Sequence, residues 1–169
     1  RSPLARAQLA PPPLVAHCLA LYFAAIGAAH VALLPPVHAR VMAPIAWTSA
    51  VILLAMSAAL RFWPVDPRYA HAAASFGAGV VLANCIVHLH ITGDPRQTTN
   101  LVLLALAAST LFVSRRWFAG LTAAIGIGWI YAFPWEIPLD QRIHWICTLC
   151  ACTGAAWVRM LARRRCFLR

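Results

Sequence analysis

The sequence predicts an all-α integral membrane protein, a bundle of six transmembrane helices with both termini in the cytoplasm. Of its 169 residues, 62% are hydrophobic and only 11% are charged, and there is no lysine. The mean hydropathy is +0.74. Apolar runs recur along the whole chain, so the pattern is not that of a signal peptide followed by a polar mature protein. These observations exclude an ordinary soluble domain.

Six apolar runs are long enough to cross a bilayer, since a transmembrane helix needs about 17–25 residues. Pro35-Pro36 should end the first helix, and Pro44 suits the first turn of the second. The fourth and fifth runs are divided at Ser114-Arg115-Arg116, because one continuous helix would place two arginines in lipid. Asp140 is the expected cap of the sixth helix. The expected spans are 14–34, 42–63, 69–92, 96–114, 117–134 and 143–162.

The arginines set the expected orientation. With six spans both termini share a side, and that side holds all of the fourteen arginines except Arg40, Arg96 and Arg142. Basic residues concentrate in cytoplasmic loops, so residues 1–162 should form a multi-pass transmembrane domain with both termini in the cytoplasm. Residues 163–169 should then begin a basic cytoplasmic tail or signalling helix. The net charge of +10 follows from this topology, so we expect a lipid bilayer and no nucleic acid as partner.

A polar hairpin joins the third and fourth expected spans. Gly93 can adopt the left-handed conformation that ends a helix. Asp94 can accept hydrogen bonds from the free N–H groups of the next helix, and Pro95 suits the first turn of that helix. Gln97 stands three residues after Asp94, which is the spacing of a capping box. The pair Asp66-Pro67 repeats the Asp-Pro start before the third span.

Histidines and carboxylates gather at the predicted outer end of the bundle. They either anchor helix ends at the lipid headgroups or form a site for a metal, a quinone, a proton or a small polar ligand. Successive residues of an α-helix are rotated by about 100°, so His88 shares a helix face with Asn84, whereas His90 points nearly the opposite way. We therefore expect His88, and not His90, to face the centre of the bundle. Phe23 and Gly27 form a comparable face in the first span. The candidate ligand-binding residues are His30, Asn84, His88, Glu136 and His144.

Two redox alternatives remain open. A pair of stacked haems does not fit, because His17 and His30 lie roughly 220° apart around their helix, but a single haem between His30 and His88 does. Cys147 and Cys150 form a C-x-x-C pair of the kind used by quinone-linked thiol oxidoreductases, although small residues also favour helix packing in lipid. The cofactor is unknown, and the alternatives are none, a single haem or a metal at the outer histidines.

The central part of the chain carries a recognisable pattern. The run 84–100 continues through an apolar helix to Ser114-Arg115-Arg116-Trp117-Phe118 and on to Gly128-Trp129. This pattern resembles the N-terminal six-helix membrane sensor region of bacterial multidomain signalling proteins, in which a PAS, histidine-kinase or diguanylate-cyclase (GGDEF) module follows the last helix. The resemblance implies a sensory or anchoring input domain of the bacterial inner membrane that is not itself an enzyme, and it assigns no binding residues. We expect a homodimer or membership of a larger membrane complex. The alternative is an accessory structural subunit of a larger membrane complex, for example a pigment or electron-transfer complex.

Overall fold

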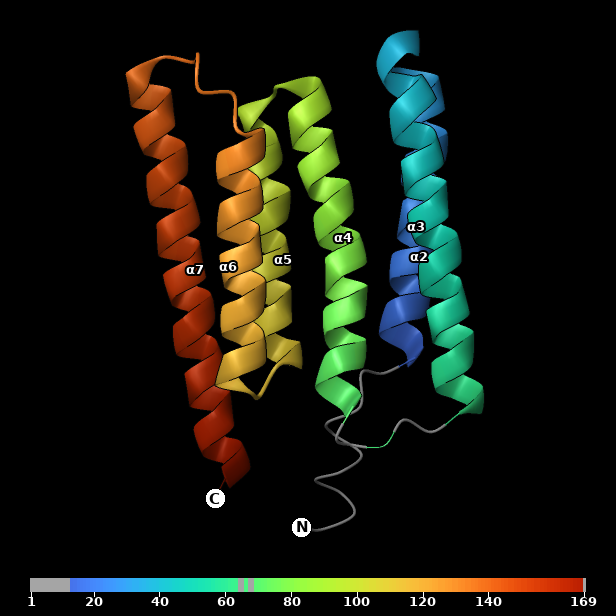
Figure 1. The fold of residues 1–169 in the computed structure, drawn as a ribbon, viewed down its shortest axis with the longest axis vertical. Helices are drawn as coiled ribbons and strands as arrows, with labels where there is room; N and C mark the ends of the chain where they lie inside the picture. Colours follow the sequence, from blue (N-terminus) through green and yellow to red (C-terminus); the bar gives the residue numbers. More distant parts are fainter. Residues whose placement is uncertain (1–12, 64–65, 67–68, 169) are drawn as a thin grey trace. The chain divides into compact units, whose positions relative to one another are not determined.

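The computed structural model describes residues 13–63, 66 and 69–168 (Figure 1). Within these ranges the protein is all-α, with six α-helices, one short 3-10 helix and no strand. The helices are α2 (Pro13–Leu33), α3 (Pro36–Phe62), α4 (Ala70–Thr92), η2 (Pro95–Gln97), α5 (Thr98–Leu111), α6 (Arg115–Ala132) and α7 (Leu139–Leu168). The chain divides into an N-terminal unit, residues 10–84, and a C-terminal unit that contains residues 85–169.

Four of these helices, α2, α3, α4 and α7, are long and apolar enough to cross a membrane. They have between 21 and 28 residues in their candidate spans, which is sufficient for the hydrocarbon core of a bilayer. The helices α5 and α6 are shorter, with 14 and 18 residues. The length and composition of the four long helices support a membrane-spanning protein, as the sequence predicted.

The second helix begins earlier than expected. Pro36, not Pro44, occupies the first turn of α3, and the connection from α2 is only Leu34 and Pro35. Pro44 therefore lies inside the helix, so the prediction that it starts the helix is wrong. Its ring removes one N–H donor from the helix, and its exposed position keeps that ring away from the buried face.

The last helix also begins earlier than expected. Asp140 is the second residue of α7 and not its cap, because the helix starts at Leu139 and the Arg142 N–H already donates to the Pro138 carbonyl at 3.0 Å. A carboxylate in the first turn still interacts favourably with the helix dipole. By contrast, the division between the fourth and fifth runs is confirmed, since α5 ends at Leu111 and α6 begins at Arg115.

In the N-terminal unit, α2 and α3 pack along small side chains. The core contains Ala20 and Phe23 of α2 with Ala46, Ala50 and Leu53 of α3. The predicted face of the first helix is confirmed, because its buried residues are Ala16, Ala20, Phe23, Gly27 and His30. The indole of Trp47 lies so close to Gly27 that an added Cβ at that position would overlap the ring.

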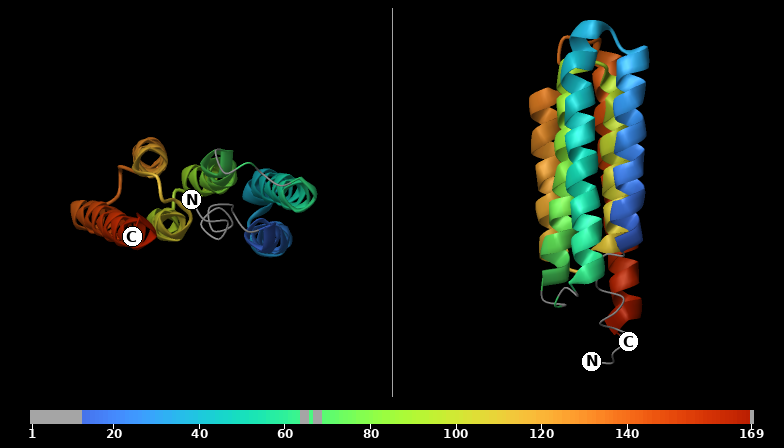
Figure 2. Two further views of the ribbon diagram at one scale, coloured as in Figure 1. Left: turned by 90° about the horizontal axis from the view of Figure 1, so that it is seen from below. Right: turned by 90° about the vertical axis from the view of Figure 1, so that its right-hand side faces the viewer.

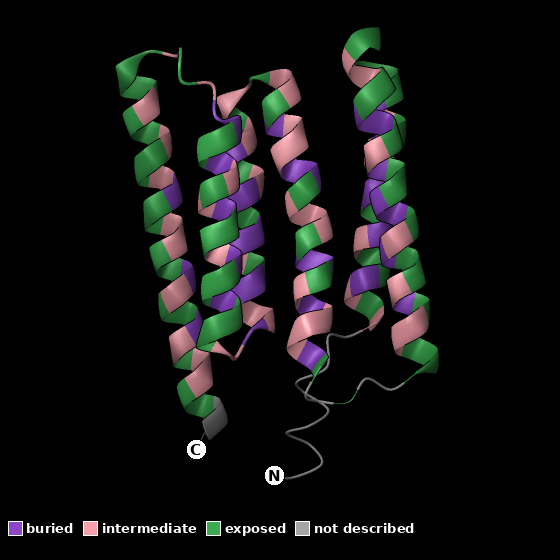
Figure 3. Cartoon of the chain, viewed as in Figure 1, coloured by how far each residue is buried: buried purple, intermediate pink, exposed green. Residues whose placement is uncertain are grey.

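In the C-terminal unit, α5 is the central helix. It lies beside both α6 and α7 (Figure 2). Half of its residues are buried, a larger share than in α7 (Figure 3). Gly128 brings α6 close to the end of α4, since an added Cβ would lie 2.8 Å from the Ile86 Cδ1 atom. Gly128 is therefore a packing residue, whereas an added Cβ at Gly120 or Gly126 meets nothing within 4 Å.

The turn between α4 and α5 satisfies its own backbone. Gly93 has a φ of +60°, the left-handed conformation expected for it. The Arg96 N–H donates to Oδ1 of Asp94 at 2.9 Å, so Asp94 caps the helical segment that Pro95 begins. Asp66 precedes α4, with its carbonyl accepting from the Tyr69 N–H at 2.8 Å, but Pro67 lies outside the described residues.

The capping box predicted for Gln97 is replaced by a different arrangement. The Asp94 N–H that such a box would satisfy donates to the Thr92 hydroxyl at 3.3 Å. The Gln97 side chain instead accepts from the Asn100 amide at 2.8 Å. Pro95–Gln97 forms a 3-10 turn before α5, which changes the direction of the Gln97 side chain relative to an α-helical N3 position.

The cap gives a stability prediction. Asp94→Ala removes the acceptor of the Arg96 N–H, and we expect it to lower the free energy of unfolding by about 0.5–2 kcal/mol. Reversible unfolding in mixed detergent micelles would measure the loss. Asp94→Asn keeps a side-chain oxygen, so it should recover most of the stability. Equal losses for the two variants would contradict a capping role.

Candidate functional site

One end of the C-terminal unit brings together the turn 93–97, the loop 133–138 and the first turns of α7. We call this the capped end. Its base is an aromatic cluster around the buried rings of Trp129 and Phe133. The Trp129 indole N–H donates to the Thr98 hydroxyl at 2.9 Å. The Trp129 ring packs on Phe133 with centroids 4.3 Å apart, and Trp135 approaches both rings edge-on at 5.7 and 5.1 Å. This cluster ties the end of α6 to the beginning of α5.

An open pocket of about 440 Å³ lies at the capped end. Two chain segments far apart in sequence line it, the 3-10 turn η2 and the first two turns of α7. Its lining residues are Pro95, Arg96, Asp140, Gln141, His144 and Trp145. The pocket therefore contains a guanidinium, a carboxylate, an imidazole, a primary amide and an indole within one concave surface.

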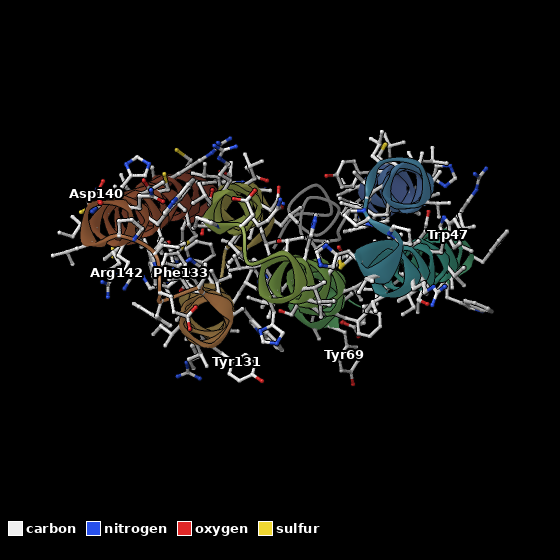
Figure 4. The ribbon with its side chains drawn as sticks, turned by 90° about the horizontal axis from the view of Figure 1, so that it is seen from above. Trp47, Tyr69, Tyr131, Phe133, Asp140 and Arg142 are labelled. Atoms are coloured by element: carbon white, nitrogen blue, oxygen red, sulfur yellow. The ribbon has the colours of Figure 1, made fainter. Side chains whose placement is uncertain are left out.

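The backbone of the turn 93–97 and of α7 positions the Cα atoms that carry these side chains. Asp94 holds the Arg96 N–H at 2.9 Å, so the backbone that carries the guanidinium is fixed by the cap. On α7, Asp140 and His144 are four residues apart and share one helix face. Arg142 projects from another side of that helix, toward Phe133 (Figure 4). Its Nε is buried and has no hydrogen-bond partner among the described residues.

The two charged lining residues, Arg96 and Asp140, are not paired with each other. Within the described ranges, the hydrogen bonds of Arg96 come from its backbone, which donates to Asp94 and accepts from the Thr98 N–H. The Asp140 side chain takes part in no ion pair there. Both side chains are exposed at the rim of the pocket. A positive and a negative group are thus available to a molecule that enters between them.

The five predicted ligand-binding residues fall into both units. His30 and Asn84 belong to the N-terminal unit and are buried. His88, Glu136 and His144 belong to the C-terminal unit, and only His144 lines the pocket. Glu136 is exposed in the loop between α6 and α7.

Asn84 has a structural partner that the sequence did not reveal. Its amide donates to the Ser49 hydroxyl of α3 at 3.4 Å, and Ser49 in turn donates to the Ile45 carbonyl at 2.9 Å. Both residues are about 5% exposed. This bond satisfies the buried Asn84 amide and links α4 to α3 within the N-terminal unit.

The two histidines at the end of α4 have different environments. His88 is half-buried, whereas His90 is exposed and stacks on Tyr131 of α6 with ring centroids 5.7 Å apart and an interplanar angle of 22°. His90 and Tyr131 therefore pack on each other, and no ligand is needed to explain these two exposed rings at the capped end. Cys147 and Cys150 are free thiols at exposed positions on α7.

Among the described residues, no three histidine, cysteine, aspartate or glutamate side chains lie close enough together to hold a metal ion. The remaining pocket residues, Arg96, Asp140, Gln141 and Trp145, were not predicted as ligands. The sequence contained one indication for Arg96, because it is one of only three arginines assigned to the outer side. Comparison with known proteins finds no match among family models, curated sequences or solved structures.

Proposed function

We propose that this chain is the membrane-embedded sensory input domain of a bacterial signal-transduction protein, and that an output domain follows Arg169. The observation that supports this most directly is the length of α7. This helix lines the pocket at Asp140 and His144 and runs unbroken to Leu168, 30 residues in all. Thirty residues rise about 45 Å, more than the roughly 30 Å of a hydrocarbon core.

A continuous helix couples its two ends mechanically. A molecule that binds one state of the pocket better than another shifts α7 toward that state, and the shift reaches the C-terminal turns without a flexible joint. Those turns carry Arg159, Arg163, Arg164 and Arg165, which favour the cytoplasmic face. The capped end then faces outward, where it can sample molecules that do not enter the cell.

The orientation is open to a direct test. In a chain whose six cysteines are replaced by serine, Ser114→Cys should react with a membrane-impermeant maleimide only after the cells are opened. Thr99→Cys, beside the turn at the capped end, should react in intact cells. The physical reason is the arginine asymmetry, which places Arg115 and Arg116 inside. Labelling of Ser114→Cys in intact cells would contradict the proposed topology.

The sensory role is tested by attaching a measurable output. We propose to fuse a diguanylate-cyclase domain after Arg169 and to measure its activity in membranes at equal protein level. Asp140→Ala and His144→Ala should change that activity, whereas Arg40→Gln, at an exposed position in the N-terminal unit, should not. One residue inserted after Arg165 rotates the output by about 100° and should alter activity. Seven inserted residues add about two turns and should restore it.

A passive anchor predicts a different pattern. Its output would be insensitive to both pocket variants, since the anchor has only to hold the enzyme at the membrane. Unchanged activity in Asp140→Ala and His144→Ala would therefore overturn the sensory function even if the inserted residues had an effect.

One observation favours a second function, that of an accessory structural subunit. Only 11% of the apolar span of α7 is buried, compared with 28–39% for α2, α3 and α4. An apolar helix face can pack against lipid or against another subunit. Extraction of the chain in native lipid particles distinguishes the two functions by mass and absorbance. A homodimer with a bare protein spectrum supports the sensor, whereas a heteromeric complex with pigment or Soret absorbance supports the subunit.

A further inference from the structure

The pocket at the capped end is lined by one full positive charge, on Arg96, and one full negative charge, on Asp140. Neither side chain is neutralised by an ion pair within the described part of the chain. A simple anion would be attracted by one of these groups and repelled by the other, and a simple cation likewise. A molecule that carries both charges at once matches both groups.

We infer that the pocket binds a phosphoethanolamine group, a zwitterion in which a phosphate and a primary ammonium are separated by two carbons. The inference rests on the proposed function, because it names the chemical class that the sensing pocket recognises. The same group occurs in two sources, as the headgroup of phosphatidylethanolamine and as a free small molecule.

The donors of the pocket suit a phosphate better than a carboxylate. Arg96 offers the planar fork of guanidinium N–H groups that pairs with phosphate oxygens. Gln141 and His144 add side-chain N–H donors on the same lining. Three donor side chains can serve the several oxygens of a phosphate, whereas a carboxylate has only two. The Arg96 N–H donates to Oδ1 of Asp94 at 2.9 Å. This bond holds the backbone of Arg96, which limits how far the guanidinium can move away from the pocket.

The opposite side of the pocket suits a primary ammonium. The Asp140 carboxylate is an acceptor, and a primary ammonium brings three N–H donors to it. A quaternary choline ammonium has no N–H donor and is bound by cages of several aromatic rings. The pocket has a single aromatic lining residue, Trp145. Phosphocholine is therefore the discriminating comparison, because it differs only in the methylation of the ammonium.

The surroundings of the pocket suit a headgroup at the membrane surface. The capped end also carries Trp135 and Tyr131, which are exposed, and such aromatic side chains concentrate at the level of the headgroups. The lipid arm and the soluble arm of the test below separate the two sources of the same chemical group.

The lipid arm uses the full chain in nanodiscs that contain equal amounts of phosphatidylethanolamine, phosphatidylcholine and phosphatidylglycerol with identical acyl chains. Native mass spectrometry then measures which lipid stays bound. We expect phosphatidylethanolamine to be retained about tenfold over phosphatidylcholine. Asp140→Asn should abolish this preference, because Asp140 faces the ammonium. Arg96→Gln should lower the retention of both lipids, because they share the phosphate. The matched controls, Arg40→Gln and Asp66→Asn, change the same side-chain types at exposed positions of the N-terminal unit and should retain the preference.

The soluble arm uses phosphoethanolamine and phosphocholine, titrated by calorimetry into the chain in nanodiscs of phosphatidylcholine alone. Selective binding of phosphoethanolamine that is lost in both pocket variants supports the inference with a free molecule as the source. Retention of phosphatidylethanolamine supports it with the lipid as the source. The inference is overturned if neither arm prefers the primary ammonium, if the preference survives Asp140→Asn, or if Arg96→Gln leaves the retention of phosphatidylethanolamine unchanged. Such a failure leaves the fusion result intact, so a sensor of another ligand is distinguished from a chain that does not sense.

Discussion

Trp129→Ala is expected to lower the free energy of unfolding of the C-terminal unit by about 3–5 kcal/mol, the cost of removing a large buried aromatic side chain. Trp129 is only 4% exposed, and it packs on Phe133 with ring centroids 4.3 Å apart. Its indole N–H also donates to the hydroxyl of the fully buried Thr98, at 2.9 Å. The substitution therefore leaves both a cavity and a buried hydroxyl that has lost its donor.

Trp117 provides the matched control, because it lies on the same helix and is 43% exposed. Trp117→Ala should cost much less in the same reversible unfolding experiment in mixed micelles. Trp129→Phe keeps most of the ring volume but removes the indole N–H, and we expect a loss of about 1–3 kcal/mol. Equal losses for Trp129→Ala and Trp117→Ala would contradict the role of the aromatic cluster as the base of the capped end.

Gly27→Ala is expected to destabilise the N-terminal unit by about 1–3 kcal/mol, the usual cost of overpacking. The new methyl group would overlap the Trp47 indole of α3, so α2 and α3 must separate or the ring must move. Alanine normally favours a helix over glycine. A loss of stability therefore reports the contact between the helices and not a change in helix propensity.

Gly79→Ala is the control for this prediction, since an added Cβ there meets nothing within 4 Å. It should be neutral or stabilising in the same unfolding measurement. Trp47→Ala in the Gly27→Ala background should recover stability, because it removes the clashing ring. If Gly27→Ala behaves like Gly79→Ala, α2 and α3 do not depend on the close approach at this position.

The elements that the sequence predicted well are those with several agreeing local signals. Gly93, Asp94 and Pro95 each favour the same turn for a different reason, and the structure has that turn. Pro44 and Asp140 were single signals, and each residue type is compatible with more than one place near the start of a helix. Where only one signal is present, the adjoining residues decide where the helix starts.

The pocket was less predictable than the helices. Its residues come from η2 and from α7, separated by more than forty positions, and their meeting depends on the antiparallel order of α5, α6 and α7. The partner of Asn84 was unpredictable for a related reason. Ser49 lies on α3, 35 positions before Asn84, so the two side chains meet only in the folded N-terminal unit. Periodicity identifies a buried face, but it does not identify what lies opposite.

The shortness of α5 has a consequence for the surrounding lipid. Its 14 residues rise about 21 Å, well below the hydrocarbon thickness of roughly 30 Å. If α5 crosses the bilayer, as the sequence predicts, this hydrophobic mismatch would thin the bilayer beside it. The turn before α5 satisfies polar groups of its own, because Thr92 and Asp94 accept from backbone N–H groups and Gln97 accepts from the Asn100 amide. We therefore expect the protein to favour thin membranes and its stability to fall as the lipid acyl chains lengthen.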